Sequence, residues 1–266
     1  MPSVSTTSDR TLFISILVLT PSPLPSSSLL SNAAGYEPSG RNFNEICLDK
    51  TGKPHNPMLN GGAIMSCALT LQLIQPRSNL AEKYDFLFHS LHRIAGYEFL
   101  GFNNSVFLSE RETADRNFAM GYFMKENKSF PASTDLQETL DLYFQSCSLE
   151  VNTETLAVMG ATLANGGTCP TTGEKVLKSS DVRDVLSLMY SCGMYNYSGE
   201  FAFKVKNCLF VAKLIDISGW FTGQVWSEWL YPAGGSKPDG GGALVAAPGL
   251  PGQLRAWDPV LQGQSR

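Results

Sequence analysis

Apolar and polar positions between residues 61 and 194 recur mostly at helical spacing, so the pattern predicts a largely helical segment. Its most informative stretch, residues 109–121, is expected to form one helix. Glu110 and Asn117 are seven residues apart, about two turns, which predicts that both lie on one face within about 20°. A carboxylate and a carboxamide so placed are able to hold a zwitterion, by pairing with its ammonium group and hydrogen-bonding its carboxylate. The alternative is a solvated helix face whose charged side chains form weak local pairs.

Five further helices are indicated by their caps and breakers. A buried helix over 63–75 is stopped by Pro76, and Asn60 is the nearest residue able to cap it. The other four have polar caps, two of them in capping boxes that include a glutamate three positions on. Their expected ranges and caps are 79–96 with Asn79, 136–147 with Asp135, 156–164 with Asn152 or Thr153, and 182–190 with Ser180.

The remaining segments predict loops and strands. Residues 37–60 are rich in Gly, Pro, Asn and Asp, which set turn dihedrals, and form a loop long enough to indicate a function. Residues 169–176 alternate around a Thr-Thr-Gly turn and predict a short hairpin. Beyond residue 198 the pattern changes, and 201–205 and 209–217 are predicted as strands.

Composition narrows the classes of function. The 266 residues are enough for one large or two modest globular domains. A net charge of −4 without a basic stripe argues against a nucleic-acid partner. No apolar run reaches the roughly 18 residues of a membrane span. The six cysteines are scattered in mostly apolar helical patterns, which favours reduced, buried thiols. Three histidines without a ligand cluster predict no metal site.

The two ends differ from the helical segment. Residues 11–19 are apolar and precede a Pro/Ser-rich run, so 1–35 are expected to be a signal-like or disordered segment outside the domain. They lack the arginine-rich, amphipathic pattern of a mitochondrial transit peptide. Residues 206–231 form a divergent segment, and 232–266 are so rich in Gly and Pro that a disordered tail is predicted.

Six runs between residues 35 and 205 resemble the catalytic domain of the glutaminase family, most closely its animal mitochondrial members of kidney or liver type. They are K-P-H-N-P-M-L-N-G-G-A-I at 53–64, A-E-K-Y-D-F at 81–86, S-E-R-E-T-A-D-R-N-F-A-M-G-Y at 109–122, L-D-L-Y-F-Q-S-C-S-L-E-V at 140–151, A-T-L-A-N-G-G-T-C-P-T-T-G-E at 161–174 and L-S-L-M-Y-S-C-G-M-Y at 186–195. The resemblance implies an α+β fold similar to serine β-lactamases and penicillin-binding proteins. Residues 36–205 are expected to hold mostly its helical part, with an incomplete antiparallel sheet.

The resemblance also implies an activity: a glutaminase is an amidohydrolase that converts L-glutamine to L-glutamate and ammonia, in glutamine catabolism and glutamate biosynthesis, with no cofactor. The family's contacts to glutamine match five positions of this sequence: Asn60, Glu110, Asn117, Tyr143 and Tyr195. Tyr195 is expected among the catalytic residues as well. Taken singly, Asn60 also suits a helix cap, and the two tyrosines suit half-buried core positions. A homo-oligomer and a mitochondrial location are implied in the same way.

The family's nucleophile and base are missing from this sequence. In the family they form a Ser-x-x-Lys run upstream of E-P-S-G, where one helical turn puts the lysine amine beside the serine hydroxyl. No Ser-x-x-Lys occurs in the 266 residues, and the glycine-rich run expected after Val205, which supplies an oxyanion N–H, is replaced by K-N-C-L-F-V-A-K. The chain is therefore expected to be a glutaminase domain truncated at both ends and impaired in catalysis.

Two other functions are compatible with parts of this sequence pattern. A non-catalytic binding or regulatory subunit that associates with intact glutaminase would keep the glutamine contacts without the nucleophile. A β-lactam- or peptidoglycan-directed relative needs the same absent Ser-x-x-Lys, and that family lacks the S-E-R-E and D-R-N runs. The sequence therefore favours the glutaminase family over the β-lactam-directed class.

Overall fold

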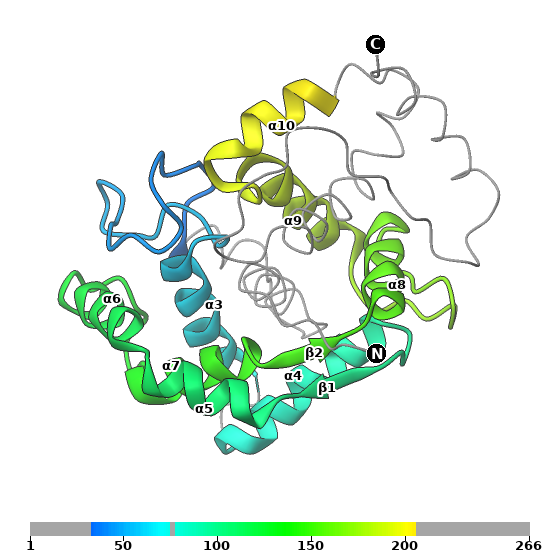
Figure 1. The fold of residues 1–266 in the computed structure, drawn as a ribbon, viewed down its shortest axis with the longest axis horizontal. Coiled ribbons are helices and arrows are strands. Elements are labelled where there is room, and N and C mark those ends of the chain that lie inside the picture. Colours follow the sequence, from blue (N-terminus) through cyan, green and yellow to red (C-terminus); the bar gives the residue numbers. More distant parts are fainter. Residues whose placement is uncertain (1–32, 75–77, 206–266) are drawn as a thin grey trace, which may run out of the picture. The chain divides into compact units, whose positions relative to one another are not determined.

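The described part of the chain, residues 33–74 and 78–205, consists mainly of helices in the computed structural model (Figure 1). Its elements are α3 (Asn60–Leu73), α4 (Leu80–Ile94), β1 (Leu100–Phe102), α5 (Asn104–Glu112), α6 (Asp115–Glu126), α7 (Leu136–Ser146), β2 (Leu149–Val151), α8 (Thr153–Ala164), α9 (Ser179–Cys192), the 3₁₀ turn η1 (Tyr195–Tyr197) and α10 (Ser198–Val205). The helical character predicted for residues 61–194 is confirmed. The predicted strand over 209–217, the segments 206–231 and 232–266, and nearly all of 1–35 lie outside the described residues.

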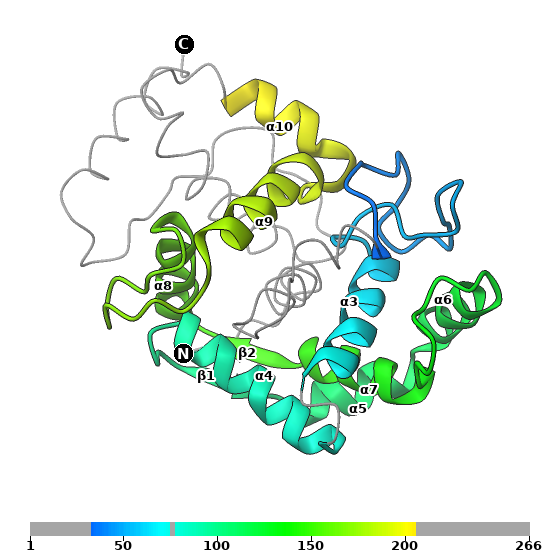
Figure 2. The ribbon, with the colours of Figure 1, turned by 180° about the vertical axis from the view of Figure 1, so that it is seen from behind.

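Helix α3 is the element on which its neighbours pack. Eleven of its fourteen residues are buried, and none carries a charge. Because a helix that is apolar on all sides must be covered on all sides, α3 takes an interior position. Both α6 and α7 pack against it, as the two views show (Figure 1 and Figure 2). Ile64 and Met65 of α3 join Phe144 of α7 and Leu91 of α4 in one buried apolar cluster.

The predicted helix starts are mostly confirmed. Asn79 and Glu82 form a complete capping box at α4. The Asp135 side chain accepts from the N–H of Glu138 at α7, and Asn152 caps α8. These caps depend only on residues three apart, so local sequence suffices to specify them.

Two predicted caps are wrong. Helix α3 is preceded by Leu59, and no side chain caps it; Asn60 is its first residue and is drawn into tertiary contacts described below. Helix α9 begins at Ser179, so Ser180 lies inside it and donates to Asp181 Oδ1 at 3.2 Å. In both cases the polar side chain hydrogen-bonds to another side chain and not to the N–H groups at the helix start.

The single helix predicted over 109–121 is also wrong, because the chain breaks there into α5 and α6. Thr113 ends α5: its N–H and its hydroxyl both donate to the carbonyl of Ser109, at 3.1 and 2.9 Å. Ala114 is buried and has φ −85° and ψ 12°, outside helical values, and Asp115 then opens α6 with an acidic first turn. Glu110 and Asn117 therefore lie on different helices, and their predicted stacking on one face does not occur.

The sheet is small and lies elsewhere than predicted. β1 and β2 pair antiparallel, with Leu100 opposite Val151 and Phe102 opposite Leu149. The strand predicted over 201–205 is instead part of α10, which packs on α9 and lies beside it in both views (Figure 1 and Figure 2). The segment F-A-F-K-V is therefore helical although its aromatic and β-branched residues favour strands. An incomplete antiparallel sheet in a mostly helical domain is nonetheless what the sequence predicted.

The hairpin predicted over 169–176 appears as a tight turn joined by one bridge, Thr168 to Lys175, with Gly173 at φ 72°. Arg93 holds it to the end of α4, because its Nε and Nη2 both donate to Glu174 Oε1, at 2.9 and 2.6 Å. All five cysteines in the described ranges are free thiols, and four of them are buried. Over residues 33–74 and 78–205, no helix combines the length and the apolar character that a membrane crossing requires.

Candidate functional site

Asn60 occupies the start of α3 with its carboxamide held at both ends. It is 7% exposed. Its Oδ1 accepts from the hydroxyl of Tyr143 at 3.3 Å, and its Nδ2 donates to Asn44 Oδ1 at 2.8 Å. Its backbone N–H donates to the carbonyl of Phe43 at 3.1 Å. The loop before α3 and the middle of α7 thus meet at this one side chain.

Tyr143 is the second member of this cluster and is buried on α7, 5% exposed. Burial raises the pKa of Tyr143 well above its ordinary value, and the nearby Cys147, Cys67 and Glu110 raise that pKa further. Of these groups, Glu110 has the smallest effect on the pKa of Tyr143. Since α5 packs against α7, two helices bring Glu110 and Tyr143 into one neighbourhood.

Tyr195 lies in η1 with a left-handed backbone, φ 51°. A non-glycine residue rarely adopts this conformation, which is found most often where surrounding structure enforces it. The ring of Tyr195 contacts that of Phe43, with centroids 5.4 Å apart. Because the Phe43 carbonyl also accepts from the N–H of Asn60, one loop residue links Tyr195 to Asn60.

Asn117 is the predicted site residue least connected to the others. It is half-buried in the first turn of α6, where its N–H donates to the carbonyl of Ala114 at 2.8 Å. Helix α6 packs against both α3 and α7, the helices of Asn60 and Tyr143. The geometry thus joins Asn60 with Tyr143 by a hydrogen bond and links Tyr195 to Asn60 through Phe43. The packing of α5 and α6 against α7 brings Glu110 and Asn117 toward this pair.

Two residues of this cluster, Phe43 and Asn44, were not singled out by the sequence. The only signal was the length of the loop 37–60 in which they lie. A loop asparagine and a loop phenylalanine look alike whether they face solvent or a site, so spacing could not identify them.

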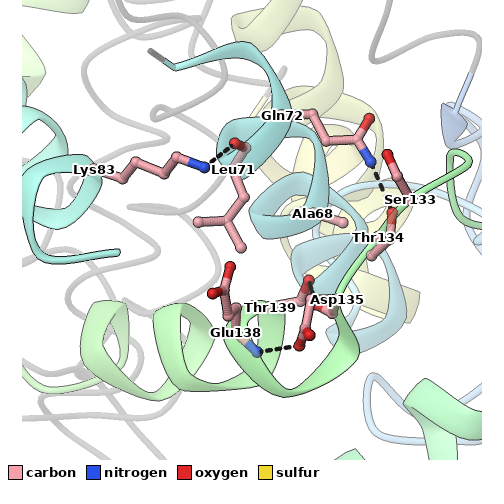
Figure 3. Close-up of a pocket in the computed structure, with 9 residues that line it drawn as sticks. All are labelled: Ala68, Leu71, Gln72, Lys83, Ser133, Thr134, Asp135, Glu138 and Thr139. Atoms are coloured by element: carbon pink, nitrogen blue, oxygen red, sulfur yellow. Dashed lines mark hydrogen bonds between the residues drawn. The ribbon is translucent and has the colours of Figure 1, made fainter. Parts of the chain in front are cut away.

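A cavity of about 360 Å³ lies at the opposite end of α3 (Figure 3). The ammonium group of Lys83 donates to the carbonyl of Leu71 at 2.7 Å and so satisfies the end of α3, while Glu138 lies in the first turn of α7. None of the five predicted site residues lines this cavity. In the described ranges, no three His, Cys, Asp or Glu side chains gather as metal ligands do.

The raised pKa of Tyr143 has a measurable consequence. Its folded-state pKa lies above the ordinary value of 10.0, so its contribution to stability is complete below that pH and is lost as pH rises through the folded-state pKa. In a spectrophotometric titration of tyrosinate, Tyr143→Phe is expected to remove absorbance only from the late part of the curve. Tyr84→Phe is the comparison, because burial and the neighbouring Asp85 raise the pKa of Tyr84 to about 12. Loss of early absorbance in Tyr143→Phe would contradict the buried position of Tyr143.

The family model described as Glutaminase matches residues 23–207, more than half of the chain. The chain belongs to the glutaminase family. Its relatives include Putative glutaminase 2 of Caenorhabditis elegans, 59% identical over 172 residues, and the mitochondrial liver isoform of Rattus norvegicus, 55% identical over 171 residues. Each match covers 64% of this chain and 28% of the relative, so the chain spans under a third of the length of these proteins.

A solved structure extends the likeness to the fold. The crystal structure of a Bacillus glutaminase in 4.3 M NaCl superposes with a TM-score of 0.66 at 32% identity, covering 76% of this chain and 65% of that one. The glutaminase fold expected from the sequence, related to serine β-lactamases, is therefore confirmed. The match to an animal liver-type glutaminase likewise confirms the resemblance on which the site residues were proposed.

Proposed function

We propose that this chain binds L-glutamine through Asn60, Glu110, Asn117, Tyr143 and Tyr195. Glu110 supplies a carboxylate for the ammonium group, and Asn60 and Asn117 supply amide N–H donors for the ligand's carboxylate. The hydroxyls of Tyr143 and Tyr195 complete the set of polar contacts. The observation that carries the proposal is the hydrogen bond from Tyr143 to Asn60, on a phenol whose pKa the charge of Glu110 also raises.

The corresponding reaction is hydrolysis of the side-chain amide of glutamine, giving L-glutamate and ammonia. The five residues bind and orient the substrate. Among them, we propose that Tyr195 exchanges a proton with the substrate. Because no Ser-x-x-Lys occurs in the 266 residues, these residues supply neither the nucleophile nor the lysine base. We therefore propose that the chain by itself turns over glutamine several powers of ten more slowly than a glutaminase that has the motif.

A second role follows from the same combination of features. A chain that retains the glutamine contacts without the nucleophile suits a binding or regulatory subunit that associates with itself or with an intact glutaminase. Residues 36–205 would carry this function, within the matched range 23–207. The rat and mouse relatives are named as mitochondrial, and we propose the same compartment for this chain.

Calorimetric titration of the full 266-residue chain with L-glutamine tests the proposal, with D-glutamine as the control for stereochemistry. Saturable binding of the L-isomer alone is expected, together with ammonia release far below that of the Bacillus glutaminase. Equal response to both isomers, or none to either, would overturn the binding proposal. Ammonia release as fast as that of the Bacillus enzyme would overturn the proposed impairment.

A further inference from the structure

The loop residue Asn44 contacts the carboxamide of Asn60, because its Oδ1 accepts from Asn60 Nδ2 at 2.8 Å. We propose that Asn44 is a positioning residue that fixes the orientation of the Asn60 carboxamide for ligand binding. The inference rests on the proposed role of Asn60 as a glutamine contact. It adds Asn44, which lies sixteen positions before Asn60 and belongs to none of the family runs quoted above.

The hydrogen bonds of Asn60 identify what Asn44 does. Asn60 donates one Nδ2 proton to Asn44 Oδ1 at 2.8 Å and accepts from Tyr143 at 3.3 Å. Its other Nδ2 proton makes no hydrogen bond within residues 33–74 and 78–205. If the amide turned by 180°, the carbonyl oxygens of Asn60 and Asn44 would face each other. Asn44 therefore selects the orientation in which one N–H remains to donate to a ligand.

The backbone around Asn44 supports this role. The N–H of Glu45 donates to the carbonyl of Asn42 at 3.1 Å, which closes a turn around Phe43 and Asn44. The carbonyl of Phe43 in turn accepts from the N–H of Asn60 at 3.1 Å. Main chain and side chain thus hold the two asparagines together, so Asn44 reaches Asn60 from a fixed position and not from a mobile tip.

The expected effect on binding follows from preorganisation. Without the acceptor at residue 44, Asn60 samples both amide orientations, and the ligand must select the one that donates. Replacing one neutral hydrogen-bond partner is expected to weaken binding about threefold to tenfold. An effect of this size acts on affinity and leaves the fold in place, because Asn44 is only half-buried.

Three variants of the full chain separate the roles of residue 44. In Asn44→Leu the acceptor is lost at similar size, and calorimetry is expected to give threefold to tenfold weaker binding of L-glutamine. In Asn44→Asp a carboxylate oxygen accepts the same N–H and has no donor with which to reverse the pair, so the affinity should stay close to that of the unchanged chain. Asn42→Leu, an exposed residue of the same turn, is the matched control and should bind normally.

A second measurement tests Asn44 without glutamine. The exchange rate of the Asn60 side-chain NH₂ protons, followed by nuclear magnetic resonance, is expected to rise in Asn44→Leu and to stay low in Asn44→Asp and Asn42→Leu. Unchanged exchange in Asn44→Leu overturns the inference, as does an equal loss of affinity in the leucine and aspartate variants. Failure of the unchanged chain to bind glutamine sinks the proposed function, and the exchange rates then decide the role of Asn44 by themselves.

Discussion

Gly62→Ala is expected to destabilise the fold by about 3 kcal/mol or more, a large share of the stability of an ordinary domain. A Cβ at this position of α3 would lie 2.0 Å from the carbonyl oxygen of Asn56 and 2.7 Å from Cα of Pro57. Both are backbone atoms of a buried loop, and Asn56 is itself fixed, since its Oδ1 accepts from the N–H of Met58 and its Nδ2 donates to the carbonyl of Glu37. The loop cannot yield without breaking these bonds. Denaturant unfolding measures the loss.

Gly61→Ala is the control, one residue earlier in the same helix turn. A Cβ at position 61 meets the sulfur of Met120 at 3.4 Å and that of Met124 at 3.8 Å, ordinary contacts with flexible side chains. Alanine also favours the helical state over glycine by up to about 1 kcal/mol. The Gly61 variant should therefore match the unchanged chain or exceed its stability. Equal destabilisation by both substitutions would contradict the close approach of the loop to α3 at Gly62.

Glu110→Gln is expected to weaken binding of L-glutamine about tenfold to a hundredfold, as measured by calorimetry. In the proposed function the Glu110 carboxylate pairs with the ligand's ammonium group, and a hydrogen bond to a charged group contributes about 1.5–3 kcal/mol. The substituted side chain at position 110 has an amide in place of the carboxylate, so it keeps the size of the original and loses its charge. The remaining affinity should also depend less on salt concentration, because the ion pair is gone.

Glu112→Gln serves as the matched control for this charge. Glu112 ends the same helix α5 and is exposed. Its removal changes the net charge of the chain equally and should leave the affinity for L-glutamine within about twofold, since a surface charge away from the ligand contributes little. If the two variants lose affinity to the same extent, Glu110 acts through the general field of the chain and not by contact.

The sequence predicted those parts of the fold that depend on neighbouring residues. The cap of α4 by Asn79 and that of α7 by Asp135 require only a polar side chain and an N–H three positions on. The buried character of α3 follows from its lack of charge. The turn over 169–176 was predicted from its Thr-Thr-Gly sequence, and Gly173 there has the positive φ, 72°, that a glycine allows.

The errors arose where a distant contact outweighed local preference. Asn60 has the chemistry of a cap, yet Tyr143 and Asn44, 83 and 16 residues away, take its side chain instead. The break at Thr113 and Ala114 is absent from the helical periodicity, because an alanine in a helix and a buried alanine between two helices look the same in sequence. The strand predicted over 201–205 is also wrong, since these residues belong to helix α10.

For the candidate site as well, the sequence identified residues but not how they are arranged. The resemblance to glutaminases supplied the five residues, because each lies in a matched run, but not how they are held. The stacking of Glu110 above Asn117 failed when the helix proved to be two. The link from Tyr195 to Asn60 passes through Phe43, a loop residue that no spacing rule selects.

The most direct test of the account is a crystal structure of the chain with L-glutamine bound. We expect the ligand's ammonium nitrogen to lie about 2.7–2.9 Å from the Glu110 carboxylate. The ligand's carboxylate should accept from the N–H of Asn60 that Asn44 leaves available. Glutamine held elsewhere, for example in the cavity beside Lys83 at the far end of α3, with Glu110 and Asn60 making no contact to it, would contradict the account.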